Sequence, residues 1–256
     1  MKARLSQHFL FDPSILGRIV DVSGIGPEDT VVEIGPGPGS LTRMLLQRAG
    51  KVVAIELDER LYGRLREELV SPKLDLVLGD CLKYPYHELG EFRVVANIPY
   101  HITTPIIFRL LREKALRSMT LTIQKEVAQR IAAAPGSGSY GVLSLAVQYR
   151  AAPKLAFVIP KGAFRPVPKV DSACIHLEIY GRPRVQVDDE GLLFGLIRGA
   201  FAQRRKTMEN GIRRLCAAPR DALLRAGIDP KRRPETLSLE DFARLADEVL
   251  RGGRAG

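Results

Sequence analysis

The tetrapeptide Asn97-Ile98-Pro99-Tyr100 carries groups suited to holding an exocyclic amine. An asparagine side-chain carbonyl, and a backbone carbonyl before or at a proline, can each accept a hydrogen bond from such an amine. Holding both N–H bonds turns the nitrogen lone pair out of conjugation and aims it at an electrophile. Tyr100 adds a flat face on which a base can stack. We therefore predict Asn97, Pro99 and Tyr100 as catalytic residues. A plain turn is the alternative, because Asn-x-Pro is also turn chemistry.

The segment Glu33-Ile-Gly-Pro-Gly-Pro-Gly39 is a glycine-rich turn after an apolar run. Gly35 and Gly37 allow the backbone to turn sharply and to approach a ligand. The spacing is G-x-G-x-G, not the G-x-G-x-x-G of dinucleotide folds. Pro36 and Pro38 also remove two N–H groups that a pyrophosphate would need. The loop therefore favours a cofactor without phosphates over NAD, with a tight turn that binds nothing as the alternative.

Two acids follow the next two expected strands. Glu56 lies 21 residues after Gly35 and can accept both hydroxyls of a ribose. Asp80 follows Gly79 and can accept the amino group of an adenine. Ligands of open α/β sheets bind outside the carboxyl ends of the strands. The glycine loop and the two acids, in this order, therefore predict a nucleoside site.

The elements that must position these residues alternate between strand and helix patterns. Short apolar runs predict strands at Thr30–Ile34, Val52–Ile55, Leu74–Leu78, Arg93–Ala96, Met119–Ile123, Leu155–Ile159 and Ala173–Ile179. Helical spacing follows the glycine loop at Leu41, Leu45 and Leu46, and recurs in Asp58–Leu69, Thr104–Leu111 and Lys125–Ala133. Alternation of this kind predicts an α/β fold with a doubly wound, mostly parallel sheet.

After about Tyr180 the pattern becomes helical only. Apolar residues recur at helical spacing from Leu192 to Phe201 and from Phe242 to Leu250. Ser238, with Asp241 three residues on, is a capping signal. We predict two domains, an α/β domain over 1–180 and a small basic helical domain over 181–256.

The charge balance favours a nucleic-acid partner. The 256 residues contain 39 Lys and Arg against 29 Asp and Glu, a net charge of +10. Each part carries +5 (23 − 18 over 1–180; 16 − 11 over 181–256), although the second is less than half as long. A generally basic proteome is the alternative explanation.

Composition also limits the cellular setting. No apolar stretch approaches the roughly 18–20 residues of a membrane span, and the N-terminus lacks the apolar core of a signal peptide. The three cysteines lie far apart without a C-x-x-C pair, which argues against disulfides and zinc. We expect a cytoplasmic protein with no metal and no membrane contact.

The combination of Asn97–Tyr100 with the Glu33–Gly39 loop resembles the family of S-adenosylmethionine-dependent rRNA adenine N6,N6-dimethyltransferases. Four more segments resemble motifs of that family: Ser6–Leu10, Gln124–Arg130, Phe164–Ser172 and Phe201–Thr207. The last is similar to the F-x-x-R-R-K-T signature of the housekeeping small-subunit enzymes. The resemblance implies a Rossmann-like methyltransferase sheet with a C-terminal all-helical, RNA-binding domain.

The resemblance also implies an activity and its partners. Methyl groups would pass from S-adenosylmethionine, leaving S-adenosylhomocysteine, to the N6 amines of two adjacent adenines. These adenines lie in a hairpin loop near the 3′ end of small-subunit rRNA, and the product is N6,N6-dimethyladenosine. The enzyme would act on the assembling small ribosomal subunit during ribosome biogenesis, and we expect it to be a monomer.

Carried over by residue, the family's site maps onto three groups of positions. The cofactor would contact His8, Leu10, Gly35, Gly37, Glu56, Asp80, Cys81 and Asn97. The target base would be held by Asn97, Pro99, Tyr100 and, on its other face, Phe164. The cluster Arg204, Arg205 and Lys206 would contact rRNA phosphates.

Three points stay open at these positions. His8 stands where the family usually has Asn, and because His titrates near neutral pH its contact and pH dependence are not settled. Phe164 is alternatively a buried anchor. Arg204–Lys206 is alternatively a solvated helix face.

Competing functions are each opposed by a specific feature. A large-subunit dimethylase that confers antibiotic resistance shares the N-terminal motifs, but Phe201–Thr207 speaks against it. A non-catalytic RNA-binding assembly factor would not need Glu56, Asp80 and Asn97 intact. An NAD-dependent oxidoreductase is least favoured, because of the prolines in the glycine loop.

Overall fold

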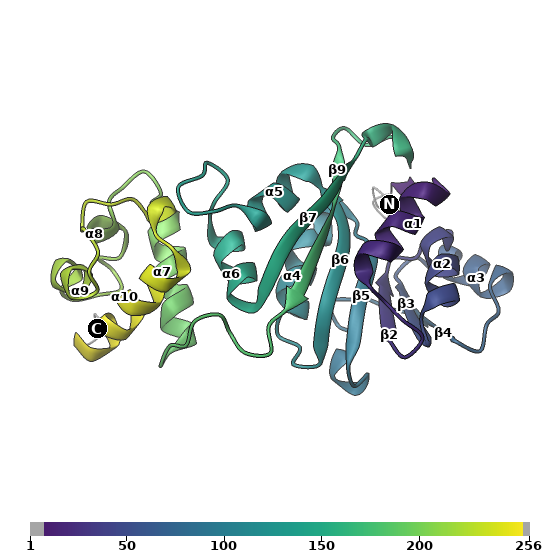
Figure 1. The fold of residues 1–256 in the computed structure, drawn as a ribbon, viewed down its shortest axis with the longest axis horizontal. Helices are drawn as coiled ribbons and strands as arrows, with labels where there is room; N and C mark the ends of the chain where they lie inside the picture. Colours follow the sequence, from purple (N-terminus) through teal and green to yellow (C-terminus); the bar gives the residue numbers. More distant parts are fainter. Residues whose placement is uncertain (1–7, 253–256) are drawn as a thin grey trace. The chain divides into compact units, whose positions relative to one another are not determined.

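The computed structural model describes residues 8–252 and contains a central seven-stranded sheet of order β4-β3-β2-β5-β6-β9-β7 (Figure 1). The strands are β2 (Thr30–Ile34), β3 (Lys51–Glu56), β4 (Leu74–Leu78), β5 (Phe92–Asn97), β6 (Leu116–Gln124), β7 (Ala151–Ile159) and β9 (Ser172–Ile179). The pairs from β4 to β6 are parallel, and β9 runs antiparallel to β6. The predicted α/β fold with a mostly parallel sheet is confirmed.

Helices cover the sheet, which is why its central strands are apolar on both faces. Figure 1 shows α1 (Pro13–Ser23) and α2 (Ser40–Arg48) on one side and α4 (Thr103–Leu110) on the other. α3 (Glu59–Glu68) packs along β3 and β4. The sequence analysis missed α1, although its signals are present. The side chain of Asp12 accepts hydrogen bonds from the first-turn N–H groups, and Gly24 ends the helix with φ 60°.

The strand order creates a switch point at β2. From β2 the chain adds β3 and β4 on one side, and then places β5 on the other side of β2. Crossovers in opposite directions leave a crevice at the carboxyl ends of β2 and β5. Gly35 follows β2 and Asn97 ends β5, so these two predicted site residues flank the crevice.

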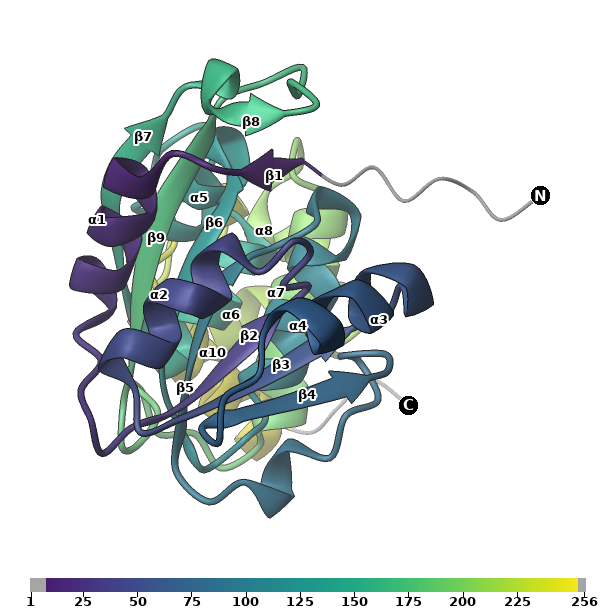
Figure 2. The same cartoon turned by 90° about the vertical axis from the view of Figure 1, so that its right-hand side faces the viewer.

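A second, two-stranded sheet joins the N-terminal segment to a distant loop (Figure 2). β1 (Phe9–Leu10) pairs antiparallel with β8 (Phe164–Arg165), with Leu10 opposite Phe164. Neither strand was predicted, because a two-residue strand has no periodicity to detect. The motif residues Ser6 and Gln7 lie outside the described residues.

The chain divides into two compact units. One comprises residues up to Ala128 with Ala152–Ile179, and the other comprises Gln129–Ala151 with the chain from Tyr180 on. The second unit contains α6 (Val142–Arg150), α7 (Glu190–Ala202), α8 (Met208–Gly211), α9 (Pro219–Arg225) and α10 (Leu239–Gly252), and α5 (Lys125–Ala132) joins the two units in sequence. The sequence analysis placed 129–151 in the α/β domain, whereas in the structure Tyr140, Leu145 and Tyr149 belong to the core of the helical unit.

Within the helical unit, the predicted capping signal forms a reciprocal pair at the start of α10. The Asp241 N–H donates to Ser238 Oγ at 3.1 Å, and the Ser238 N–H donates to Asp241 Oδ2 at 3.0 Å. Across residues 8–252, every helix falls short of the length and apolar character that crossing a bilayer requires.

The entry into β3, the strand that carries Glu56, depends on close backbone packing at Gly50. A Cβ at this position would lie 2.3 Å from the backbone carbonyl oxygen of Pro27, which cannot move aside as a side chain can. We predict that Gly50→Ala lowers the free energy of unfolding by about 1–3 kcal/mol in urea titrations.

Gly63, in the middle of α3, is the matched control, since a Cβ there meets nothing within 4 Å. Gly63→Ala should raise the free energy of unfolding by about 0.5–1 kcal/mol, because alanine favours the helix over glycine. Equal effects of the two substitutions would contradict the packing at Gly50.

Candidate active site

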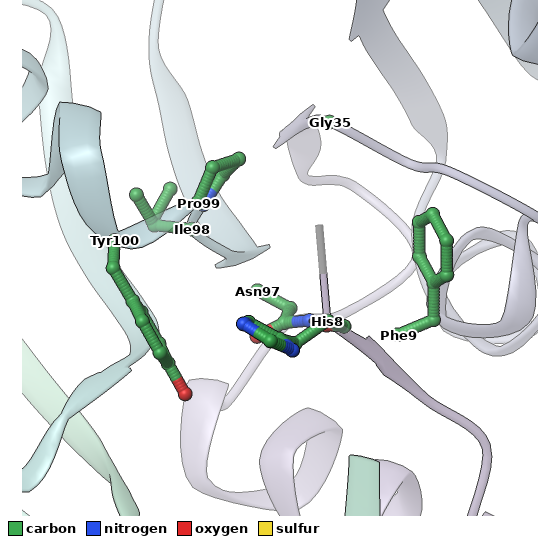
Figure 3. Close-up of a pocket in the computed structure, with 7 residues that line it drawn as sticks. All are labelled: His8, Phe9, Gly35, Asn97, Ile98, Pro99 and Tyr100. Carbon is green, nitrogen blue, oxygen red and sulfur yellow. Dashed lines mark hydrogen bonds between the residues drawn. The ribbon is translucent and has the colours of Figure 1, made fainter. Parts of the chain in front are cut away.

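Three pockets meet at Gly35, at the switch point of the sheet. The Asn97 pocket is lined by His8, Phe9, Gly35, Asn97, Ile98, Pro99 and Tyr100 (Figure 3). The acidic pocket is lined by residues that include Gly35, Glu56, Asp80, Cys81, Pro99 and His101. The Glu33 pocket is lined by residues that include Phe9, Leu10, Glu33, Gly35, Pro36 and Asn97. The structure thus brings seven of the eight predicted cofactor residues to adjoining pockets.

In the acidic pocket, Glu56 is held by backbone donors. Its Oε2 accepts the N–H of Gly37 at 3.1 Å, and its Oε1 accepts the N–H of Asp58 at 2.9 Å. Burial raises the pKa of Glu56, while these two hydrogen bonds act in the opposite direction. Asp80 Oδ1 likewise accepts the Leu82 N–H at 2.9 Å. Each carboxylate keeps lone pairs with which it can accept hydrogen bonds from a ligand.

Gly37 lies apart from the other predicted cofactor residues. It is buried and lines none of the three pockets, and its φ is +56°. A Cβ at this position would lie 2.5 Å from Cε1 of Phe9, so only glycine lets that ring pack over the loop. The role that the structure gives Gly37 is therefore to orient Glu56 through its N–H.

Asn97 has its orientation set by the N-terminal segment. Its Nδ2 donates to the backbone carbonyl of His8 at 2.9 Å. A carbonyl can only accept a hydrogen bond, so the amide nitrogen of Asn97 must face His8. The amide oxygen Oδ1 therefore faces the other way, where it can accept a hydrogen bond. At Pro99 the carbonyl accepts the N–H of Ile102 at 3.1 Å, which favours the Ile98 carbonyl as the second acceptor for an amine.

Tyr100 is half-buried beside Asn97. Its hydroxyl lies 2.7 Å from Ser172 Oγ, and burial raises its pKa. The imidazole of His8 packs near its ring, with centroids 5.6 Å apart and planes tilted by 31°. His8 Nδ1 lies 2.7 Å from the carbonyl of Pro166, so Nδ1 carries the proton of this bond. Figure 3 shows His8 and Asn97 between Tyr100 and Phe9. These are the contacts that His8 makes within the protein, and its contact with the cofactor stays a prediction.

Phe164 is not where a base-stacking ring would be. It has no exposed surface and packs in the core of the α/β unit with Leu10, Ile159 and Cys174. Its backbone pairs with Leu10 across β1 and β8. A stacking face must be accessible, so the expectation of a sandwich with Tyr100 is corrected: in this structure Phe164 is a buried anchor for β8.

Glu33 is a site residue that the sequence analysis missed. It is 2% exposed, and among residues 8–252 its Oε2 has no hydrogen-bond partner. Burial raises its pKa to about 8. A buried carboxylate oxygen without a donor fits a ligand that brings a positive charge or an N–H group. The available signal was a single glutamate in an otherwise apolar strand, Thr30–Ile34.

The three cations predicted to contact phosphates, Arg204, Arg205 and Lys206, differ in their surroundings. The Arg204 guanidinium donates to the carbonyl of Gly138 at 2.8 Å, within the helical unit. Arg205 and Lys206 are exposed, and among residues 8–252 their side chains have no acidic partner. In the same span, no three His, Cys, Asp or Glu side chains are grouped so as to hold a metal ion.

The sheet order and the glycine loop at the switch point define the Rossmann-like α/β fold of a methyltransferase, with two acids at successive strand ends. Residues 1–250 match the family model described as ribosomal RNA adenine dimethylase. The chain belongs to the ribosomal RNA adenine dimethylase family, whose members are S-adenosylmethionine-dependent methyltransferases.

Individual relatives cover nearly the whole chain. Ribosomal RNA small subunit methyltransferase A of Clostridium acetobutylicum is 47% identical, with 97% of this chain and 93% of that protein aligned. The protein of the same name from Bacillus mycoides is 44% identical over 97% of this chain and 91% of its own length.

Two solved structures are similar over their full length. A dimethyladenosine transferase from Plasmodium falciparum has a TM-score of 0.83 at 27% identity, covering 93% of this chain and 96% of that one. The 23S rRNA methyltransferase ErmE has a TM-score of 0.74 at 28% identity, covering 94% and 99%.

The raised pKa of Glu33 makes a prediction about stability. Because the pKa is about 8 in the folded chain against an ordinary 4.5, the folded state binds more protons between these values. The contribution to stability is therefore complete below pH 4.5 and is lost as pH rises toward 8, by up to about 1.4 kcal/mol per pH unit. Urea unfolding of the ligand-free protein at pH 5, 6.5 and 8 measures it.

Glu33→Gln should remove this slope, so that wild type loses stability relative to the variant as pH rises. Parallel pH profiles for the two proteins would show that Glu33 titrates normally.

Proposed function

We propose that the protein transfers methyl groups from S-adenosylmethionine to the N6 amines of two adjacent adenines. They lie in a hairpin loop near the 3′ end of small-subunit rRNA, and the products are N6,N6-dimethyladenosine and S-adenosylhomocysteine. The observation that carries the proposal is Asn97, whose amide nitrogen is bound to His8 so that its carbonyl remains to accept an amine. The 41–47% identity to small-subunit enzymes, against 28% to ErmE, supports small-subunit rRNA over the large-subunit alternative.

The three pockets fit the parts of S-adenosylmethionine. Glu56 would accept the ribose hydroxyls, and Asp80 the adenine amino group beside Cys81. The orphaned Oε2 of Glu33 suits the cationic amino-acid end, near Leu10 and Gly35. When bound, this cofactor supplies a methyl group on a positively charged sulfur, which is already a strong electrophile.

The chain's own groups then have to make the adenine amine nucleophilic. The lone pair of that amine is delocalised into the ring, and the base must leave its stack to reach the pocket. Asn97 Oδ1 and the Ile98 carbonyl accept hydrogen bonds from the two N–H groups of the amine and turn its lone pair out of conjugation with the ring. Tyr100 stacks on the adenine ring. A strong general base is not required, because the nitrogen becomes positively charged once the methyl is attached, and its acidic proton can then pass to solvent water.

The helical unit supplies the proposed rRNA contacts. Arg205 and Lys206 are exposed and without acidic partners in the described part of the chain, and they suit phosphate oxygens. The fixed guanidinium of Arg204 instead supports the loop at Gly138. We expect the enzyme to act in the cytoplasm, as a monomer, on the assembling small subunit.

Loss of Glu56 tests the cofactor site. Removing a charged acceptor costs about 1.5–3 kcal/mol of binding, so Glu56→Ala should bind S-adenosylmethionine at least tenfold more weakly in titration calorimetry. Asp58→Asn is the control, since it keeps the backbone N–H that Asp58 donates to Glu56 and leaves the Glu56 carboxylate in place. Unchanged affinity in Glu56→Ala would remove Glu56 from the ribose contact.

Single-turnover methylation of unmethylated small subunits, with labelled cofactor and mapping of the label, tests the reaction. Wild type should label the two adjacent adenines. Asn97→Ala should be about a hundredfold slower or worse, since it loses both orientation and transition-state stabilisation.

Tyr100 separates stacking from hydrogen bonding in the same assay. Tyr100→Phe loses only the bond to Ser172 and should retain substantial activity, whereas Tyr100→Ala should not. If both Tyr100 variants proved equally inactive, the hydroxyl and not the ring would be essential. Label at any other rRNA position would contradict the proposed substrate.

A further inference from the structure

The helical unit contains a hollow whose lining shares no residue with the three pockets at Gly35 and includes Lys206, one of the cations proposed above to contact rRNA. Five exposed polar residues line it, and none is acidic, apolar or aromatic: Gln203, Lys206, Asn210, Arg213 and Arg214. We propose that this cationic hollow binds one phosphate group of the rRNA, with Arg213 and Arg214 as its main ligands. The proposal rests on the rRNA substrate proposed above and adds a phosphate site to it.

A tight turn after α7 forms one wall of the cationic hollow. The Gln203 N–H donates to the carbonyl of Ala200 at 3.1 Å, and the Lys206 N–H donates to the carbonyl of Gln203 at 2.7 Å. Two successive turns thus lead from the end of α7 toward α8, which begins at Met208. Gln203 and Lys206, at the ends of the second turn, line the hollow together with Asn210, Arg213 and Arg214.

Close packing of small residues brings the second wall into place. A Cβ on Gly211 would lie 3.2 Å from Cα of Ala200, and one on Gly199 would lie 2.6 Å from Cδ1 of Leu215. The segment after α8 therefore returns directly against α7. Ile212 and Cys216 are buried in the core, so Arg213 and Arg214 between them remain exposed at the hollow.

The charges of the hollow have no internal neutralisation. Within residues 8–252, no carboxylate pairs with Lys206, Arg213 or Arg214, and no hydrogen bond engages their side chains. Glu209, the nearest acid in sequence, has its carboxylate 3.7 Å from Arg220 instead. Three neighbouring cations repel one another, and an anion in the hollow relieves that repulsion.

The lining favours a phosphate over an acidic protein segment. Guanidinium groups match two phosphate oxygens with parallel N–H bonds. The side-chain amides of Gln203 and Asn210 add neutral hydrogen-bond donors. One N–H of the Asn210 amide donates to Thr207 Oγ1 at 3.1 Å. A protein partner would be expected to bury apolar surface as well, and none of the five lining residues provides any.

Charge removal at the hollow tests the proposal. The Arg213→Gln/Arg214→Gln double variant is compared with Arg182→Gln/Arg198→Gln, which removes the same charge from exposed arginines elsewhere in the unit. Binding to a small-subunit rRNA transcript and to unmethylated small subunits is measured over a range of salt concentrations.

The hollow variant should bind the transcript at least tenfold more weakly at low salt, and its log–log salt slope should fall by about 0.7–0.9, the value for one phosphate. The control pair should keep a slope closer to that of wild type, and both variants should bind cofactor and unfold as wild type does.

Three outcomes would overturn the assignment. If the hollow variant bound rRNA as tightly as wild type, the hollow would be a solvated surface. If both variants lost affinity equally, the effect would come from the overall positive charge of the unit and not from the hollow. Weaker binding to subunits with unchanged binding to the transcript would assign the hollow to a ribosomal protein. Failure of the wild-type protein to methylate small subunits would refute the proposed function instead. That result comes from the methylation assay and is independent of the salt slope of binding.

Discussion

The hydrogen bond from Asn97 Nδ2 to the carbonyl of His8 organises the site, because it decides which atom of the amide faces the ligand. The bond requires the N-terminal segment to cross the carboxyl ends of the strands, where β1 is held by pairing with β8. From that position Phe9 covers Gly37, whose N–H in turn holds Glu56. One short strand and the residue before it thereby orient both Asn97 and the acid at the end of β3.

This arrangement removes two carboxyl groups from water, which costs free energy. Glu33 and Glu56 are almost fully buried, and burial raises the pKa of each. Backbone N–H groups offset the cost at Glu56, whereas no donor within the described part of the chain reaches Oε2 of Glu33. A buried acceptor left unpaired destabilises the ligand-free fold and gains a partner when a cationic ligand binds. The burial of these two acids therefore lowers the stability of the ligand-free fold, and the proposed cofactor would recover part of that loss.

The helical unit follows a different physical logic. Its core is apolar and separate, and glycines at 199 and 211 allow α7 and α8 to approach closely. Packing of this kind places arginines at a hollow, and no acid of residues 8–252 pairs with them. The α/β unit therefore carries the recessed, partly buried groups suited to chemistry, while the helical unit carries exposed charge suited to a polyanion.

Local sequence determined the parts whose physics is local. Apolar runs set the central strands, prolines and glycines set the loop after β2, and the acids Glu56 and Asp80 at strand ends line one pocket, as their positions predicted. Only the tertiary structure decided the orientation of Asn97 and the burial of Phe164. It also decided that Oε2 of Glu33 lacks a hydrogen-bond partner among the described residues and that residues 129–151 belong to the helical unit. Each depends on groups far apart in the chain, such as the 89 residues between His8 and Asn97, and no local periodicity encodes such contacts.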